Sequence, residues 1–223
     1  MKVITFLSAT SLSAAKTTEN RLLPFIQQAL KKNYKVNLIT PDSEKLQIKN
    51  NNFLHKAINT PNKKNANIFI RGLKELLISF RVVTSALKMK SSYYFVTIPS
   101  PLIIFLCFLL PKKSLIIDVR DLTWNYLPSN SLPKTIFKNI VVRISENFLG
   151  RARLLLASNS QEKDYLSKVF GEHKNIKLIS NGVNSEKFLE LSNLKNKEDK
   201  PVVGYFGSMG GAQNIGALIK LAK

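Results

Sequence analysis

Short apolar runs alternate along the chain with longer segments that have helical periodicity. Several of the short runs are apolar almost throughout, which is typical of strands buried on both faces of a sheet. The predicted strands are residues 2–7, 35–40, 93–98, 114–119, 153–158 and 176–180. The predicted helices are residues 17–32, 66–90, 101–110, 133–150 and 160–170. Thr17 or Thr18 can cap the first helix, and Glu19 lies in its first turn.

This alternation predicts an α/β fold with a doubly wound parallel sheet. Such sheets bind ligands beyond the carboxyl ends of their strands, so we expect function in the loops at that edge. Residues 189–200, "LELSNLKNKEDK", are polar and lack a strong period, and residues 201–223 start a new strand, turn and helix. We therefore expect a first domain over 1–188, a linker over 189–200 and the opening of a second, incomplete domain over 201–223.

Two apolar stretches look like targeting signals but fit a buried core better. The apolar run in "MKVITFLSATSLSAA" is broken at Thr5 and Ser8, short of the roughly 7–15 residues of a signal-peptide core. We therefore expect a buried first strand. Residues 102–110 span about half of the roughly 20 residues that a membrane-crossing helix needs, so we expect a core helix, with shallow membrane insertion as the alternative. The single cysteine, Cys107, lies in that run, which predicts a small core residue, no disulfide within the chain and a reducing compartment.

The chain is strongly basic, with 34 Lys and Arg against 14 Asp and Glu and a formal net charge of +20. Such a surface attracts nucleic acid, anionic lipid or phosphorylated substrates. Abundant Lys, Asn and Ile are also what an AT-rich genome produces, so part of the charge can be compositional. Nucleic-acid binding needs aromatic side chains among the cations, and Trp124, Tyr93 and Tyr94 are not placed in that way. Nucleic acid is therefore not an expected partner.

The sequence lacks the motifs that several common kinds of enzyme chemistry and cofactor binding require. His55 and His173 are the only histidines, and neither has a Cys, His or acid at metal-ligand spacing, so no metal site is expected. There is no nucleophile elbow, Walker A loop or Cys-x-x-Cys pair. "SATSLSAAKTTEN" follows the first strand in place of G-x-G-x-x-G, which argues against a bound NAD or FAD. No cofactor is expected.

Two stretches at the carboxyl ends of predicted strands are candidate substrate sites. In "IPSP", Pro99 and Pro101 fix an extended turn around Ser100. In "LIIDVRDLTW", a buried strand ends in Asp118, Arg120 and Asp121. Asp118 and Arg120 share one face of the strand, and Asp121 points the other way. These charges either form an Arg–Asp ion pair that fastens the loop or line a cleft, and the pattern leaves both readings open.

A third stretch, "GYFGSMGGAQN", is a glycine-rich turn between a predicted strand and a predicted helix. Its glycines allow close backbone approach, and the start of the helix offers unpaired N–H groups to a phosphate. A fourth feature lies in the helix over 66–90. Arg71, Lys74, Arg81 and Lys88 fall within about one third of its circumference. They could rest on anionic lipid at ~1 kcal/mol per cation, or they form an ordinary solvated face.

In this order, "IPSP", "LIIDVRDLTW", "ASNSQEKDYL", "IKLISNGVNSEKF" and "VVGYFGSMGGAQNI" resemble the family 4 retaining glycosyltransferases of the GT-B fold. The bacterial branch that builds O-antigen, capsule and related surface polysaccharides looks closest. The resemblance covers most of the chain from about residue 93 to 216. It implies a Rossmann-like domain that holds the acceptor and a second such domain that holds the nucleotide sugar.

The resemblance also implies roles for individual residues. Arg120 and Asp121 would contact sugar or acceptor and are the candidate catalytic residues. Candidate binding residues on the acceptor side and at the exit from the first domain are Pro99, Ser100, Asp118, Asn181 and Gly182. Those that would face the donor diphosphate are Gly207, Ser208, Gly210, Gly211 and Asn214. The implied chemistry is sugar transfer with retained anomeric configuration and without a bound metal.

The implied setting is the inner face of the cytoplasmic membrane, with a cytoplasmic, peripherally associated enzyme and a lipid-linked or polysaccharide acceptor. The family's two-glutamate motif, which binds the donor sugar and ribose, is absent from these 223 residues. We therefore expect this chain alone to be inactive or weakly active and to be truncated within the second domain. The alternative is a non-catalytic acceptor-domain protein that binds an anionic membrane surface or a partner subunit.

Overall fold

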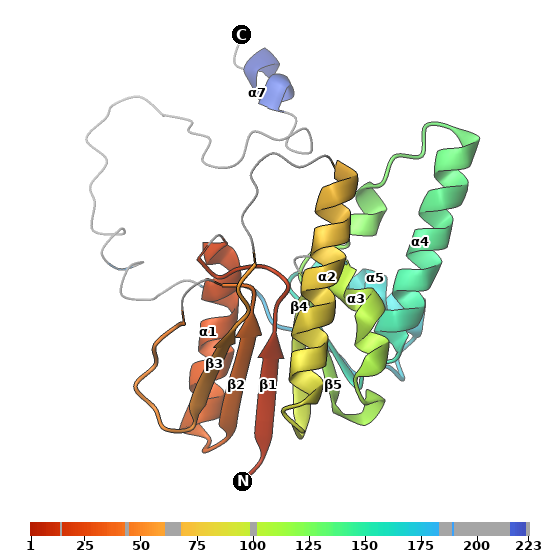
Figure 1. Ribbon diagram of the computed structural model, residues 1–223. Helices are drawn as coiled ribbons and strands as arrows, with labels where there is room; N and C mark the ends of the chain where they lie inside the picture. The colour runs from red at the N-terminus through yellow and green to blue at the C-terminus, as the bar shows by residue number, and fades with distance from the viewer. Residues whose placement is uncertain are drawn as a thin grey trace. The chain divides into compact units, whose positions relative to one another are not determined.

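A sheet of seven parallel strands forms the centre of the first part of the protein in a computed structural model (Figure 1). The structure describes residues 1–13, 15–42, 45–60, 68–98, 102–182, 189 and 215–221, and it divides into two compact units, Met1–Gly182 and Val183–Lys223. The strands of the first unit are β1 (Val3–Leu7), β2 (Lys35–Thr40), β3 (Phe53–Ala57), β4 (Tyr93–Ile98), β5 (Leu115–Val119), β6 (Leu154–Ala157) and β7 (Ile176–Leu178).

The strand order is β3-β2-β1-β4-β5-β6-β7, with every neighbouring pair parallel. This is the order of a Rossmann-like sheet, in which the chain direction across the sheet reverses between β1 and β4. Thr97 of β4 and Asp118 of β5 are paired in register, as are Asp118 and Leu156 of β6. The predicted doubly wound α/β fold is therefore confirmed.

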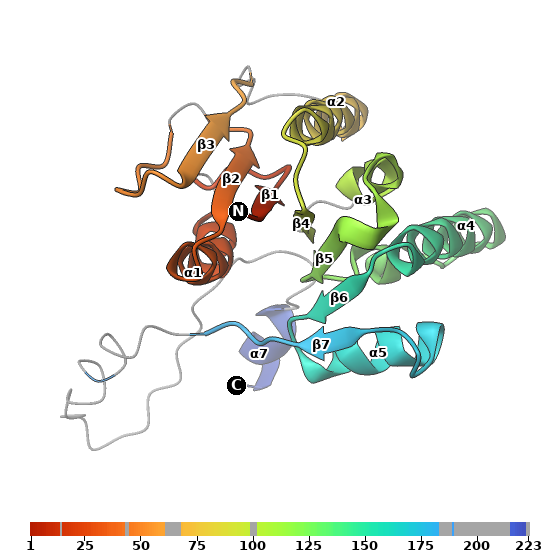
Figure 2. The ribbon, with the colours of Figure 1, turned by 90° about the horizontal axis from the view of Figure 1, so that it is seen from below.

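Helices cover both faces of this sheet (Figure 2). They are α1 (Lys16–Lys31), α2 (Ile68–Leu87), α3 (Leu102–Leu106), α4 (Leu132–Gly150) and α5 (Ser160–Phe170). The described connections contain three short 3-10 helices: η1 (Cys107–Leu109), η2 (Lys112–Ser114) and η3 (Thr123–Tyr126). Leu22 and Ile26 of α1 pack in one core cluster, whereas buried residues of α2, α3, α4 and α5 share the other. In the second unit the structure describes one helix, α7 (Ile215–Leu221), inside the segment predicted to be helical.

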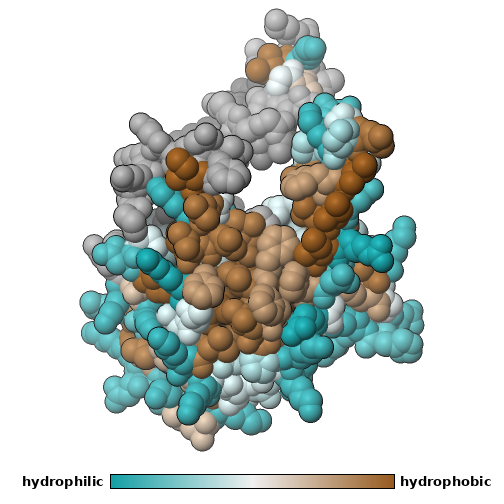
Figure 3. Space-filling model, turned by 45° about the vertical axis from the view of Figure 1, so that its right-hand side comes forward, coloured by the Kyte–Doolittle hydropathy of each residue, from teal (hydrophilic) through white to brown (hydrophobic). Residues whose placement is uncertain are grey.

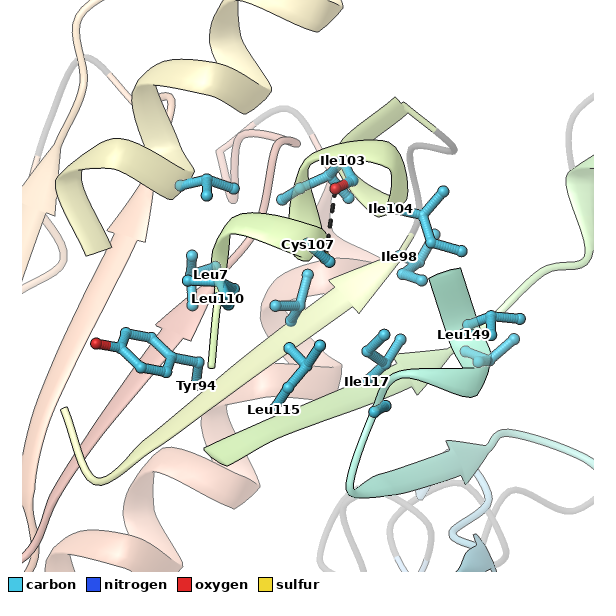
Figure 4. Packing of buried hydrophobic residues seen from close by; sticks show 14 of the residues in the cluster. Leu7, Tyr94, Ile98, Ile103, Ile104, Cys107, Leu110, Leu115, Ile117 and Leu149 are labelled. Carbon is cyan, nitrogen blue, oxygen red and sulfur yellow. Dashed lines mark hydrogen bonds between the residues drawn. The ribbon is translucent and has the colours of Figure 1, made fainter. Parts of the chain in front are cut away.

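The larger core cluster lies between α3, α4 and the sheet (Figure 4). Ile103, Ile104 and Cys107 point from the 102–110 segment onto Ile98 and Leu115, which confirms that this apolar run is core. The run is α3 followed by η1 rather than one helix. The Cys107 thiol lies 3.4 Å from the Ile103 carbonyl oxygen, and burial raises its pKa to about 12, as suits an inert core thiol.

Two predictions about elements are wrong. The edge strand β3 was not expected, because its sequence "FLHKA" contains His55 and Lys56 and lacks an apolar run. The helix α1 begins at Lys16, and its N-cap residue is Ala15, with no side-chain cap. Neither Thr17 nor Thr18 is the cap, although Glu19 does lie in the first turn. The predicted buried first strand is confirmed, because β1 pairs with β2 and β4 in the middle of the sheet.

Candidate functional site

A buried ion pair joins α1 to the carboxyl end of β5. Arg21 Nη2 donates to Asp118 Oδ1 at 2.7 Å, and Arg21 Nε lies 3.3 Å from both carboxylate oxygens. Thr97 Oγ1 donates to Asp118 Oδ2 at 3.0 Å. Both charged side chains are almost completely buried. A paired and hydrogen-bonded carboxylate of this kind is a fixed structural support for the groups around it.

The same guanidinium also holds the segment that follows β7. Arg21 Nη1 donates to the Ile179 carbonyl oxygen at 2.6 Å, and it lies 3.5 Å from Asn181 Oδ1. The Arg21 guanidinium also lies over the Phe25 ring, 5.3 Å from its centroid. One arginine therefore positions three parts of the chain that are far apart in sequence: α1, β5 and residues 179–181.

Arg120 follows β5 directly and turns to the same side as Asp118. Its Nη1 donates to Thr18 Oγ1 of α1 at 3.0 Å, and its Nε is buried without a hydrogen-bond partner among the described residues. No described carboxylate forms an ion pair with it. Arg120 thus keeps a positive charge that no described acid neutralises.

These groups surround an open pocket of about 440 Å³, which is within the usual size range of ligand sites. Thr17, Asn20 and Arg21 line it from α1, Arg120 lines it from the end of β5, and residues 179–182 line it after β7. Among the described residues that line it, none is Asp or Glu. An arginine in such a place is suited to an anionic or strongly polar ligand, because its planar guanidinium presents several N–H donors at once.

The structure brings together Asp118, Arg120, Asn181 and Gly182 among the residues singled out from the sequence. The two readings of "DVRD" turn out to concern different residues. Asp118 does form an ion pair, but with Arg21 rather than with Arg120, whereas Arg120 lines the pocket. Asp121 is exposed just beyond β5. The other candidates, Pro99, Ser100, Gly207, Ser208, Gly210, Gly211 and Asn214, lie outside the described residues.

Sequence reasoning missed Arg21, and it named Thr18 only as a possible helix cap and not as a partner of Arg120. A signal for Arg21 was present, because it lies on the buried stripe of α1 together with Thr18, Leu22 and Ile26. A charged side chain on the core stripe of an amphipathic helix requires a buried partner. The partner itself, 97 residues further along the chain, could not be identified from spacing.

A second buried polar cluster fastens the loop after β1. The Asp42 carboxylate accepts hydrogen bonds from the hydroxyls of Ser11 and Thr40 and from the backbone N–H groups of Leu12 and Ser13. Burial alone would raise the pKa of Asp42, but these hydrogen bonds together lower it below its ordinary value. Residues 11–13 are therefore held by the buried Asp42 carboxylate, which the sequence pattern did not reveal.

His55 on β3 completes this cluster. Its Nδ1 accepts from the Leu46 N–H at 2.7 Å, so Nε2 carries the proton and donates to Thr40 Oγ1 at 2.7 Å. Burial lowers the pKa of His55, and the nearby Asp42 charge opposes this only in part. The imidazole is therefore neutral in the folded protein and acts as a structural link between β2 and β3. The described residues contain no group of three or more His, Cys, Asp or Glu that could hold a metal ion.

No known family model matches the chain, and no curated protein sequence does. Among solved structures, a sucrose-phosphate synthase from Thermosynechococcus elongatus is similar, with 12% identity and a TM-score of 0.49 over 86% of this chain and 96% of that one. UGT73P12 from Glycyrrhiza uralensis, solved with glycyrrhetinic acid 3-O-monoglucuronide, is also similar, with 8% identity and a TM-score of 0.47. That match covers 82% of this chain and 48% of the other. Because both TM-scores are below 0.5, the fold assignment rests on the strand order of the chain itself.

Proposed function

We propose that this chain contains the acceptor-side domain of a retaining glycosyltransferase of the GT-B type. Its reaction would move a sugar from a nucleotide-sugar donor to a lipid-linked or polysaccharide acceptor during synthesis of bacterial surface polysaccharide. The motifs that resemble family 4 enzymes support this proposal, and so does the Rossmann-like order of the strands. The O-antigen or capsule pathway follows from the resemblance alone.

One observation carries the proposal: Arg120 lines a pocket at the carboxyl edge of the sheet and has no described carboxylate partner. That edge is where sheets of this kind bind their ligands. Two of the motifs that suggested the family, "DVRD" and "SNGV", contribute Arg120, Asn181 and Gly182 to this pocket, although about 60 residues separate them. A lipid-linked saccharide carries phosphate next to its sugar, and Arg120 is suited to bind that phosphate.

The charges around the pocket suggest a separate role for each residue. Arg120 would hold the anionic part of the acceptor, while Asn181 and the exposed Asp121 would contact sugar hydroxyls. Asp118 and Arg21 would act beneath them as positioning residues, because their polar atoms are already engaged with each other. The donor would be held by the second domain, and departure of its diphosphate leaves oxocarbenium character on the sugar, which retaining enzymes stabilise electrostatically. No metal is expected in this step.

We further propose that the protein works in the cytoplasm, peripherally on the inner face of the cytoplasmic membrane. The lipid-linked acceptor requires contact with that surface. We expect this chain alone to bind the acceptor but to transfer sugar weakly or not at all, because its sequence lacks the two-glutamate motif that the family uses for the donor.

Isothermal titration calorimetry of the whole chain tests this proposal with two ligands. One is a water-soluble, short-chain polyprenyl diphosphate sugar, and the other is a uridine diphosphate sugar. We expect the first to bind and the second to bind much more weakly. The variant Arg120→Gln should lose roughly tenfold or more in affinity for the first ligand, because a charge-assisted hydrogen bond is removed, and Arg120→Lys should recover part of the loss.

Arg153 offers a matched control. Its guanidinium is exposed and lies over Tyr93, 5.8 Å from the ring centroid, outside the lining of the pocket. Arg153→Gln should therefore keep the affinity of the unmodified chain. Equal affinities of Arg120→Gln and the unmodified chain, or preferential binding of the nucleotide sugar, would contradict the proposed role of this domain.

The second candidate is a non-catalytic protein that binds an anionic membrane or a partner subunit through the same domain. The exposed apolar side chains of α2 and α4 favour it, because they require a binding partner whether or not sugar is transferred. Saccharide binding in the pocket distinguishes the two candidates, since only the transferase needs it.

A further inference from the structure

The face of α2 that points away from the sheet is apolar. The inward positions of α2 are the buried residues Ser79, Val82, Val83 and Ala86. At 100° per residue, the opposite side holds four side chains that are 50–55% exposed: Ile70, Leu73, Leu77 and Phe80. A surface helix of a soluble domain normally turns polar side chains outwards. This side of α2 therefore requires an apolar environment.

The helix α4 repeats the same feature. Four of its exposed apolar residues recur at every fourth position, which puts them on one side of the helix: Leu132, Ile136, Ile140 and Ile144. Phe137, which is 61% exposed, widens this apolar side. The only buried residues of α4 are Ser145 and Leu149, near its carboxyl end. The first half of the helix extends beyond the core (Figure 1), and these four apolar side chains stay 41–75% exposed although α4 contacts α3 and η3.

The two helices present these side chains on one face of the protein. The short helix α3 packs against both α2 and α4, and its continuation η1 adds Phe108, which is 47% exposed. The Phe108 and Phe148 rings lie 6.1 Å apart, which joins η1 to α4. Figure 3 shows hydrophobic residues over both helices and between them on this side. We call the apolar residues of α2, η1 and α4 named above the α2–α4 face.

Positive charges border this face. Arg71 and Arg81 of α2, with Lys88 just after it, are exposed along one side of the apolar stripe. On α4, Arg143 is exposed three residues after Ile140, on the same side of the helix as the apolar residues. The acids of the two helices are Glu75 and Glu146, and the Glu146 carboxylate accepts the Tyr165 hydroxyl at 2.6 Å. The border of the α2–α4 face is therefore basic, in a chain whose formal net charge is +20.

The arrangement of charges indicates which partner fits the α2–α4 face. An apolar centre with cations around it is complementary to a lipid surface with anionic headgroups. A second copy of the chain would bring two basic borders together, which is unfavourable. Within the described residues, no helix is long and apolar enough to cross a bilayer, so insertion is limited to the interfacial depth.

We propose that the α2–α4 face docks on an anionic bilayer, with its Leu, Ile and Phe side chains in the interfacial layer and its Arg and Lys side chains at the headgroups. This differs from a purely electrostatic contact of the basic side of α2, because apolar insertion supplies a separate contribution to binding. Both helices begin at the carboxyl edge of the sheet, where the pocket around Arg120 also lies. A lipid-linked acceptor could then stay in the bilayer while its head group reaches the pocket, a consequence that rests on the proposed function, whereas docking itself does not.

Flotation of the whole chain with vesicles tests the docking. The vesicles are phosphatidylcholine alone or phosphatidylcholine mixed with phosphatidylglycerol. We expect preferential binding to the mixed vesicles. The variants Leu73→Gln/Leu77→Gln and Ile136→Gln/Ile140→Gln should each weaken binding to both kinds of vesicle, on the order of tenfold, because partitioning scales with the apolar area inserted.

Two further variants separate the electrostatic contribution to vesicle binding from the contribution of apolar insertion. Arg71→Gln/Arg81→Gln should weaken binding to the mixed vesicles only, and added salt should have the same effect. Leu54→Gln removes a similarly exposed leucine from the edge strand β3, outside the α2–α4 face, and should leave binding unchanged. Circular dichroism checks that every variant remains folded.

A tryptophan placed in the face gives a direct reading of insertion. Ile136→Trp should show a blue-shifted emission and quenching by brominated lipids when vesicles are added, whereas Leu54→Trp should show neither.

Unchanged flotation of both apolar double variants would overturn the proposal, as would absence of binding to mixed vesicles. Loss of self-association rather than of vesicle binding in these variants would assign the face to a second copy of the chain. Failure of saccharide binding in the pocket would count against the proposed transferase alone.

Discussion

At the scale of single residues, the ion pair between Arg21 and Asp118 makes a strong prediction about stability. Both side chains are almost completely buried, so removal of one charge leaves the other without a partner. Asp118→Asn should lower the free energy of unfolding by about 3–5 kcal/mol. The double variant Arg21→Met/Asp118→Leu should recover much of this loss, because no buried charge remains. Urea unfolding followed by circular dichroism measures these differences.

The exposed pair between Lys16 and Glu19 provides the control. Its N–O distance of 2.6 Å is as short as that of the buried pair, but the Lys16 side chain is 74% exposed. Glu19→Gln should therefore cost only about 0–1 kcal/mol. If Glu19→Gln and Asp118→Asn cost the same, burial would not be what makes the Arg21–Asp118 pair important.

The buried histidine predicts how stability depends on pH. Burial lowers the pKa of His55 below its ordinary value of 6.5, so the unfolded chain binds this proton at a higher pH than the folded chain does. The resulting stability is fully present above pH 6.5 and is lost as the pH falls below it towards the lower folded pKa. His55→Gln should flatten the slope of unfolding free energy against pH in that range. His173→Gln, on an exposed turn, is the matched substitution against which the slope of His55→Gln is compared. A slope unaffected by His55→Gln would show that other groups cause it.

These residue-level contacts explain why the site could be predicted only in part. Asp118 and Arg120 were identified because charges at the end of an apolar strand are conspicuous, and their common face follows from the period of a strand. Their true partners, Arg21 and Thr18, depend on how α1 packs on the sheet. Sequence spacing carries no information about contacts between segments about 100 residues apart.

At the scale of elements, the capping of α5 can be compared with that of α4. Asn159 at the start of α5 accepts the Glu162 N–H at 2.8 Å, and Glu162 Oε2 in turn accepts from the Ser158 N–H at 2.9 Å. Asn159→Ala should therefore lower the free energy of unfolding by about 1 kcal/mol. Ser131, the N-cap residue of α4, makes no side-chain cap bond, so Ser131→Ala should cost much less. Chemical denaturation of both variants measures the difference, and equal costs would contradict the capping role of Asn159.

Most elements could be predicted because their patterns are strong and local. Six of the seven described strands of the sheet and the helices α1, α2, α4 and α5 lie where the apolar runs and the helical period placed them, and the predicted helix 101–110 is the shorter α3 followed by η1. The exceptions have physical reasons. The edge strand β3 is paired on one side only and tolerates His55 and Lys56, so its sequence lacks the apolar run of a central strand. The start of α1 is fixed by the loop anchored on Asp42, which overrides the capping preference of Thr17 and Thr18.

At the scale of the whole molecule, the first unit contains everything that a domain needs to fold alone. The two core clusters and the seven strands of the described residues belong to Met1–Gly182. A polypeptide of residues 1–182 should therefore unfold in one cooperative transition, with a urea midpoint close to that of the whole chain. Near-ultraviolet circular dichroism of the buried Trp124 and urea titration together measure this.

A shorter polypeptide tests whether the contacts made by the residues after β6 contribute to this stability. Residues 1–174 lack β7, whose pairing satisfies one edge of β6, and they lack Ile179, whose carbonyl oxygen accepts from Arg21 at 2.6 Å. The buried Arg21 guanidinium would then keep its ion pair with Asp118 but lose its hydrogen bond to the Ile179 carbonyl oxygen. The urea midpoint should therefore fall well below that of residues 1–182. Equal midpoints for the two polypeptides would mean that the segment after β7 does not hold Arg21 in place, and the geometry of the pocket around Arg120 would lose its structural basis.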